Sequence, residues 1–441
     1  MDVDTNADRV LPSENVISIV NPNLPSLEQK MEIDGSIDHS KKMHIYPEPT
    51  DMGMNGPLEF IIHETPGYYV DLTSIVIDVK VKLYNAGGGR DDVANWKSYF
   101  INNLAQNLWS SIKVSLNNTV IESNYNNQQL SNLHHILTTP NILVKERGFV
   151  QGCFPITTSS IKNTIDDDHV EVDDIKKRIA YSKSNDIHLM APLHLDLTSA
   201  TKFLTDGVNI KITLEPSNAM FLIKRTDTAG VTKVDHKYKI EGIRLMVTKY
   251  KPVDGVLISE TKKLLNKPFE YVMRRNIVKE VVFPQGHSEL TISRPFQAIV
   301  PNKIYMFMIE QSGARGTYNK HPFNYGHNNL QSYSIKLNGL EIAGHETDDG
   351  LVETYLESLR EHGEDYFISY DVYKKSCFVI CADMNQGSNE NTIAIERRGN
   401  LQISLRLNAP LPQSLLVYVV GVVDSTFEID TNKSVTTHFQ Y

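Results

Sequence analysis

Cysteine and long apolar runs are scarce in this chain of 441 residues. The three cysteines, Cys153, Cys377 and Cys381, are an odd number without a Cys-x-x-Cys spacing, so we expect buried free thiols in a reducing compartment rather than a disulfide framework. The longest apolar run, Leu415–Val423, is too short to span a bilayer, which takes about 20 residues, and it predicts a buried strand. The acidic N-terminus has no apolar core of the kind found in signal peptides, so we expect no secretory signal.

Basic charge is also in short supply. Lys and Arg total 44 against 53 Asp and Glu, which gives a formal net charge of −9. A surface that binds nucleic acid needs a basic face, so we expect no sequence-specific nucleic-acid binding. The 40% hydrophobic and 22% charged residues are ordinary for a globular protein, and the length suits two domains of about 200 residues each.

Catalytic and metal-binding motifs are missing. The sequence has no His-Glu-x-x-His, Gly-x-Ser-x-Gly, P-loop or Gly-x-Gly-x-x-Gly, and no His-x-His pair like those that hold a metal in jelly-roll enzymes. His134 and His135 are adjacent on a predicted helix and point about 100° apart, which disfavours a shared metal. His321 and His327 are too few for a structural zinc site. We therefore predict neither an enzyme nor a cofactor or metal.

One acidic stretch invites a calcium interpretation. Asp166, Asp167 and Asp168 are consecutive, but the spacing and the glycine of an EF-hand loop are absent around them. We therefore expect residues Ile161–Lys177 to form a solvated polar loop.

The sequence contains the same β-hairpin pattern at two positions. Ser334–Gly344 reads SIKLNGLEIAG, an alternating strand, an Asn-Gly turn and a returning strand. Asn-Gly is the strongest two-residue hairpin signal because both central residues of a type I′ turn need positive φ. Ser111–Glu122 reads SIKVSLNNTVIE and follows the same plan around Asn117-Asn118. The copies start 334 − 111 = 223 residues apart, far beyond the roughly 20–50-residue period of a solenoid, so they indicate duplication of a whole domain.

Further elements repeat in the same order after each hairpin. A helical pattern comes first, then an alternating strand, then a longer apolar strand. The first copy has these at Asn126–Thr138, Val208–Leu214 and Ile240–Val247, and the second at Leu351–His362, Leu401–Leu407 and Leu415–Val423. Short strands with large loops and no alternation of strand and helix predict an antiparallel β-sandwich repeated twice, with short helices in its loops.

The limits of the two copies follow from local composition. Residues 1–45 contain three prolines and scattered acids, and we expect a flexible N-terminal arm that is either disordered or ordered against a partner subunit. The turn signature Pro252-Val253-Asp254-Gly255 predicts the domain boundary, with a short linking helix at Leu257–Leu265. The predicted domains are residues 46–253 and 254–441.

The second hairpin and the loop before it resemble a known family. His321-Pro322-Phe323-Asn324-Tyr325, followed by a strand that ends in a Leu-Asn-Gly turn, resembles an Asn-Pro-Phe-aromatic element of the major capsid proteins of Polinton (Maverick) elements and adintoviruses. His321 stands where that element has Asn. The segment Lys239–Pro284, with its Arg274-Arg275 pair and VVFPQG end, and the first-half strand Leu108–Leu116 are similar as well. The likeness covers most of residues 55–440.

The resemblance implies a fold and a function. The fold would be all-β, a double jelly-roll of two tandem antiparallel sandwiches. The protein would be a major capsid protein whose homotrimers form pseudo-hexagonal capsomers and tile an icosahedral shell. Its partners would be further copies of itself, neighbouring capsomers, and penton and minor capsid proteins, whereas an internal membrane is left open. It would be located in the virion, after synthesis in the host cytoplasm and assembly in the nucleus.

Aromatic residues favour one loop as a subunit interface. Gly313–Asn329 is dense in Gly, His and aromatic residues, and we predict Pro322, Phe323 and Tyr325 at the interface because aromatic anchors are enriched at interface cores. The alternative function is a two-domain jelly-roll that binds a glycan or receptor, but only two tryptophans, Trp96 and Trp109, are present for such a cleft. A penton protein is a third interpretation, which the duplication disfavours because penton proteins are usually single jelly-rolls.

Overall fold

The first half of the chain forms two antiparallel sheets of four strands that enclose a shared interior. The computed structural model describes residues 35–48, 56–85, 89, 97–141, 143–162, 164–184, 187–225, 236–346, 351–362, 368–384 and 397–439. One sheet has the order β1 (Ile37–Ile45), β10 (His236–Pro252), β3 (Tyr69–Asn85) and β7 (Ile187–Pro192). The other has the order β2 (Leu58–Ile62), β8 (Ile210–Pro216), β5 (Trp109–Leu116) and β6 (Thr119–Asn124). In β3, Ile75, Ile77 and Val79 are fully buried at alternate positions, as the period of a strand requires.

The second half repeats this arrangement. One sheet has the order β11 (Phe269–Phe283), β20 (Leu415–Ile429), β14 (Lys303–Glu310) and β17 (Ile380–Asp383), with β21 (Val435–Thr437) paired to β20. The other has the order β12 (Glu289–Ser293), β19 (Leu401–Leu407), β15 (Leu330–Leu337) and β16 (Leu340–Glu346). Two short pairs complete the strands: β4 (Tyr99–Phe100) with β9 (Ile223–Lys224), and β13 (Ile299–Val300) with β18 (Arg397–Arg398).

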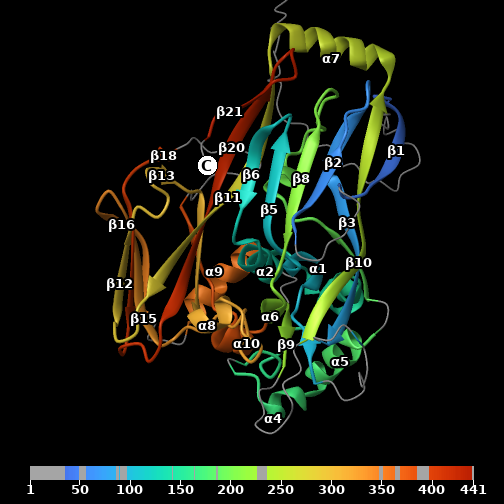
Figure 1. Cartoon of the computed structure of the whole chain (residues 1–441). Helices are drawn as coiled ribbons and strands as arrows, with labels where there is room; N and C mark the ends of the chain where they lie inside the picture. Colours follow the sequence, from blue (N-terminus) through green and yellow to red (C-terminus); the bar gives the residue numbers. More distant parts are fainter. Residues whose placement is uncertain are drawn as a thin grey trace, which may run out of the picture.

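Each half is an eight-stranded jelly-roll with the same connectivity. Leaving out the short pairs and β21, one sheet of each half has the strand order first–eighth–third–sixth and the other second–seventh–fourth–fifth. Two sheets of four antiparallel strands connected in this way are a jelly-roll. The double jelly-roll predicted for this chain is therefore confirmed, and Figure 1 shows the two halves side by side, with β5 and β8 in one and β15 and β12 in the other.

The duplicated hairpins agree at the level of single hydrogen bonds. Asn117 N donates to Asn209 O (3.1 Å), and Asn209 N donates to Asn117 Oδ1 (2.8 Å). The second copy has the same pair, with Asn338 N donating to Asn400 O (2.9 Å) and Asn400 N to Asn338 Oδ1 (2.8 Å). Both asparagines have positive φ, 42° at Asn117 and 52° at Asn338, as the sequence predicted for a primed turn. The turn asparagine thus ties each hairpin to the strand beside it.

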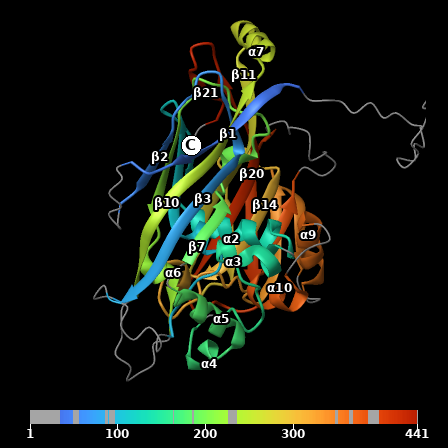
Figure 2. The same cartoon turned by 90° about the vertical axis from the view of Figure 1, so that its right-hand side faces the viewer.

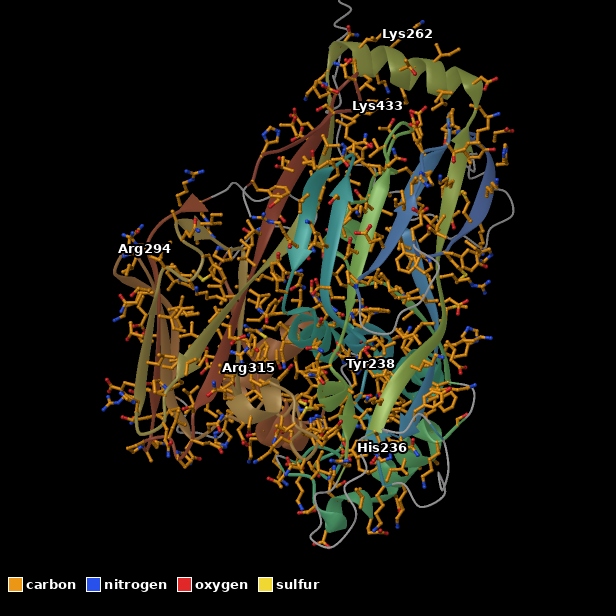
Figure 3. The ribbon with its side chains drawn as sticks, viewed as in Figure 1. His236, Tyr238, Lys262, Arg294, Arg315 and Lys433 are labelled. Carbon is orange, nitrogen blue, oxygen red and sulfur yellow. The ribbon has the colours of Figure 1, made fainter. Side chains whose placement is uncertain are left out.

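Helices fill the loops of both jelly-rolls. Their bounds are α1 (Leu104–Asn107), α2 (Asn127–Thr138), α3 (Gly148–Gln151), α4 (Asp167–Val170), α5 (Asp173–Ser182), α6 (Ala219–Leu222), α7 (Asp254–Asn266), α8 (Gln311–Ala314), α9 (Val352–His362) and α10 (Tyr370–Ser376). η2 (Leu143–Arg147) is a short π-helix and η3 (Asp196–Ser199) is a short 3-10 helix. The three helices predicted from the sequence match α2, α7 and α9. Helix α7 lies across one end of the molecule, with Lys262 on it, and α4 and α5 lie at the other end (Figures 1, 2 and 3).

Within the described part of the chain, no helix combines the length and the apolar character needed to cross a membrane.

Two sequence predictions need correction. Residues Ile37–Ile45 were expected in the flexible arm, but they form β1, which pairs with β10 along its length. The strand was missed because it is a polar edge strand with most of its side chains exposed, so it has no apolar alternation. Residues 1–34 of the predicted arm lie outside the described residues.

The predicted solvated loop Ile161–Lys177 is the other correction. It contains α4 and the start of α5, and the Ile175 side chain of α5 is fully buried. Asp166 caps α4, because its Oδ1 accepts a hydrogen bond from His169 N at 2.8 Å. The acid cluster therefore begins a helix.

The hydrophobic core is continuous across the two halves. One cluster of buried side chains includes Phe60 and Trp109 of the first half together with Phe283 and Phe307 of the second. The three cysteines are buried and free, as the sequence predicted. A continuous core means that the two jelly-rolls are packed as one body.

Candidate functional site

The main structural feature of this chain outside its two jelly-roll cores is the contact between them. Among the described residues, no three or more His, Cys, Asp or Glu side chains are grouped to hold a metal ion. We define the interlobe seam as the first-half elements α2 and η3 with residues 117–122, 203–207 and 221–225, together with the second-half element β11 and residues 311–329 and 430–437. The halves touch along this seam from the α7 end to the middle of the molecule (Figure 1).

Strand β11 is hydrogen bonded to the first half at several places. The Tyr271 hydroxyl donates to Phe203 O (3.2 Å) and accepts from Thr205 N (3.1 Å). Asn276 donates twice to the Asp196 carboxylate, from N at 3.0 Å and from Nδ2 at 2.6 Å. Side chains of one half thus satisfy backbone groups of the other, which fixes their relative position.

The first repeated hairpin also reaches across the seam. Asn117 Nδ2 donates to Lys433 O (2.9 Å), and Thr119 Oγ1 donates to Val435 O of β21 (3.1 Å). The Lys433 ammonium forms an ion pair with Asp206 at 3.0 Å, with both side chains about a quarter exposed. Figure 3 shows Lys433 near the α7 end of the molecule. The turn asparagine of the first copy therefore has a second role that Asn338, its counterpart in the second copy, does not show.

Helix α2 holds the loop that precedes β15. The Tyr325 hydroxyl donates to Gln129 Oε1 (2.9 Å) and accepts from Asn132 Nδ2 (2.9 Å). Gln129 Nε2 in turn donates to Pro322 O at 3.1 Å. Gln129 and Asn132 are only 4% and 2% exposed, so these bonds lie in the interior. Bonds of this kind are costly to break because the groups left behind cannot reach water.

Residues 221–225 hold the other end of the same loop. Lys224 Nζ donates to Thr317 O (2.8 Å), and Arg225 N donates to Tyr318 O (3.0 Å). The Arg225 guanidinium lies 4.2 Å from the centre of the Tyr318 ring. Gly316 has φ +85°, and a Cβ there would stand 3.1 Å from the backbone of Phe221. Only glycine suits that conformation and that close approach.

Burial at the seam shifts the pKa of several groups. Desolvation raises the pKa of both Glu122 and Asp196, two buried carboxyl groups that interact with each other near β11. Desolvation lowers the pKa of Lys224 to about 7 and holds the pKa of His321 well below its usual range. These side chains are therefore closer to their neutral forms in the seam than they would be in water.

The predicted interface residues lie inside a single chain. Phe323 is 2% exposed and Tyr325 fully buried, and the Pro322 side chain is buried as well. The Phe323 ring packs edge-on against Phe221 at 5.6 Å between centroids, and the Tyr325 ring lies 4.3 Å from that of Phe307. These side chains join the two halves of one chain, and their role at an interface between subunits stays a prediction.

The first-half side chains that hydrogen bond to this loop, Gln129 and Asn132, were not predicted from the sequence. Gln129 and Asn132 occupy polar positions of a helix that was predicted correctly, but nothing local marks them as buried. The tryptophans considered for a glycan cleft do not form one in the described residues: Trp109 is fully buried in the core, and Trp96 lies outside the described part of the chain.

Comparison with sequences finds one distant relative and no family. No family model matches the chain. The uncharacterized protein F54H12.2 of Caenorhabditis elegans is 21% identical over an alignment of 255 residues, and the alignment covers 54% of this chain and 60% of that protein. The match therefore spans less than two thirds of the relative's length.

Comparison with solved structures finds the same fold over nearly the whole chain. A chain of the Sputnik virophage has a TM-score of 0.64 at 12% identity, covering 97% of this chain and 93% of its own. The mavirus major capsid protein has a TM-score of 0.54 at 11% identity, covering 99% and 97%. The Faustovirus major capsid protein has a TM-score of 0.57 at 8% identity, covering 91% and 92%. At these identities the likeness establishes the fold, the double jelly-roll of major capsid proteins.

Proposed function

We propose that this protein is a major capsid protein whose homotrimers are the pseudo-hexagonal capsomers of an icosahedral shell. The observation that carries the proposal is the pair of jelly-rolls with identical strand order in one chain, locked together by the interlobe seam. The likeness to the mavirus and Faustovirus major capsid proteins over more than nine-tenths of the chain supports it.

The duplication has a simple geometric use. Three chains with two similar jelly-rolls each present six similar units around one axis, so a closed trimer suits a six-fold lattice position. This works only if the two jelly-rolls of a chain keep a fixed relative orientation. The continuous core and the cross-seam bonds of Tyr271, Asn276 and Tyr325 supply that rigidity.

The finer parts of the proposal follow the resemblance noted in the sequence. We propose a protein of the Polinton or adintovirus type with a structural rather than an enzymatic role. Its partners are neighbouring capsomers and penton and minor capsid proteins. Its place is the virion, after synthesis in the host cytoplasm and assembly in the nucleus.

We further propose domain limits that use the strand pairing. The first jelly-roll begins with β1, ahead of the predicted limit at residue 46, and ends at residue 253, and the second occupies residues 254–441. In support, no pairing between named strands in the described residues joins a strand before α7 to one after it. As part of the same proposal, the loop that contains Pro322, Phe323 and Tyr325 contributes to the trimer contact. These side chains act indirectly, because their packing sets the shape of the loop.

The solution mass tests the trimer. Light scattering of the purified full chain is expected to give about 150 kDa, three chains of 49.9 kDa, and negative-stain images of that peak a hexagonal outline. A monomer of 49.9 kDa that is unchanged by salt and protein concentration would contradict the proposal and favour the glycan- or receptor-binding alternative.

Deletion of residues 1–34 tests the predicted arm separately. The deletion ends before β1, so we expect the trimer to form as in the full chain. If the arm latches neighbouring capsomers, shells will no longer assemble from these trimers. Normal shells from the shortened chain would remove that role and leave the trimer proposal standing.

A further inference from the structure

A small cavity lies where the first half meets the loop of His321. Its lining includes Arg178 of α5, Asn132 and Ile136 of α2, and His321 and Phe323 of the second half. Its volume is about 10 Å³, room for a single species about the size of a water molecule. Arg178 and His321 are 1% and 3% exposed, so the polar lining of the cavity belongs to the interior.

The two charged or basic residues of this lining have unused hydrogen-bond donors. Arg178 Nη2 donates to Pro155 O at 3.4 Å, but its Nε and Nη1 have no partner. His321 Nδ1 accepts a hydrogen bond from Phe323 N at 3.2 Å, so the ring proton is on Nε2, which also has no partner. Three donor nitrogen atoms of buried side chains that line one cavity therefore lack an acceptor.

The local charge is positive. Asp174 of the same helix is a carboxylate whose charge acts on Arg178, but among the described residues it forms no ion pair with the guanidinium, which also lies 5.5 Å from the Phe154 ring. Lys224, equally buried, uses its ammonium on the carbonyl oxygens of Met220 and Thr317 rather than on an acid. A buried guanidinium without a carboxylate paired directly to it is costly to the folded state, and an anion in contact with it would offset part of that cost.

We propose that this cavity binds a monatomic anion, chloride or another halide, that accepts hydrogen bonds from Arg178 and His321. The ion would bridge α5 of the first half and the His321 loop of the second, and so form part of the interlobe seam. Because the site lies within one chain, it does not depend on trimer formation.

The chemistry of the lining distinguishes an anion from water. A water molecule accepts two hydrogen bonds and must also place two hydrogens of its own, whereas a halide accepts from all three donors and has no hydrogen to place. Of the remaining lining, Ile136, Ile156 and Ile161 offer no acceptor, and the amide oxygen of Asn102 already accepts a hydrogen bond from Phe154 N. The small volume favours a monatomic anion over sulfate, phosphate and organic anions.

Thermal unfolding of the full chain tests the site. We compare sodium chloride with sodium gluconate at equal ionic strength, since gluconate cannot enter the cavity. An ion that binds only the folded state raises the unfolding midpoint with concentration, here by about 1–2 °C for each tenfold rise in chloride above saturation. The Arg178→Met variant should lose this chloride dependence, while Arg406→Met, which removes an exposed guanidinium of β19, should keep it.

Bromide provides a readout that does not depend on any variant folding. Crystals of the full chain grown in sodium bromide are expected to show an anomalous scattering peak between Arg178 and His321. Equal midpoints in chloride and gluconate, together with a cavity that contains density without an anomalous signal, would identify the occupant as water and overturn the proposal. Either an anomalous peak or a midpoint shift that Arg178→Met abolishes supports it.

Discussion

Removing the Tyr325 hydroxyl is the most direct test of the interlobe seam. Tyr325→Phe keeps the ring against Phe307 but leaves Asn132 Nδ2 and Gln129 Oε1 without their partner, both in side chains that are at most 4% exposed. Each unsatisfied buried group costs about 1–3 kcal/mol, and partial rearrangement recovers some of it, so we expect a loss of about 2–4 kcal/mol in the free energy of unfolding.

Urea-induced unfolding of the full chain measures this loss. Tyr125→Phe is the matched control, because Tyr125 is 75% exposed and the same chemical change there should shift stability by less than about 0.5 kcal/mol. A double-mutant cycle with Asn132→Ala should give a coupling energy of about 0.5–3 kcal/mol, since the two side chains share one hydrogen bond.

If Tyr325→Phe is as stable as Tyr125→Phe, or if the cycle shows no coupling, the hydroxyl does not hold the two halves together. The seam would then rest on its apolar contacts alone.

Three further predictions concern the same seam. Burial raises the pKa of Glu122 and Asp196, so the protonated forms of both side chains favour the folded state. The stability from these groups is present below the ordinary carboxyl pKa range and is lost as the pH rises through the raised pKa values. Glu122→Gln should therefore flatten this decline in the free energy of unfolding, measured between about pH 4 and about pH 8. Gly316→Ala should lower the free energy of unfolding by about 1–3 kcal/mol because of its positive φ and the close backbone, and an unchanged thermal midpoint would refute this. Asn117→Ala should cost more than Asn338→Ala, because only the first asparagine also bonds across the seam, and equal urea midpoints for the two variants would count against that role.

Regular local patterns made much of the fold predictable. The Asn-Gly and Asn-Asn turns, the period-2 strands and the helices after the hairpins depend on residues close in sequence, and all of them appear near the predicted positions. Repetition at a distance of half the chain then indicated two copies of one domain. The two identical strand orders are the three-dimensional form of that repetition.

The elements that were missed lack such a local signal. Strand β1 is polar because it lies at a sheet edge, and the strand with which it pairs, β10, comes about two hundred residues later. Helix α5 was hidden in a run of charges, although its Arg178 is almost completely buried. A charged residue is expected in water, and only a tertiary environment can place it inside.

The sequence by itself determined the β-rich elements, the duplication and the absence of catalytic motifs, because turn chemistry and hydrophobic periodicity are properties of neighbouring residues. Only the tertiary structure decided which residues of the two duplicated halves contact each other. It placed Asn132 against Tyr325 across 193 residues of chain, and it packed Phe323 of the second half against Phe221 of the first. Burial is set by whatever the fold brings alongside, and for these residues the partner is in the other jelly-roll.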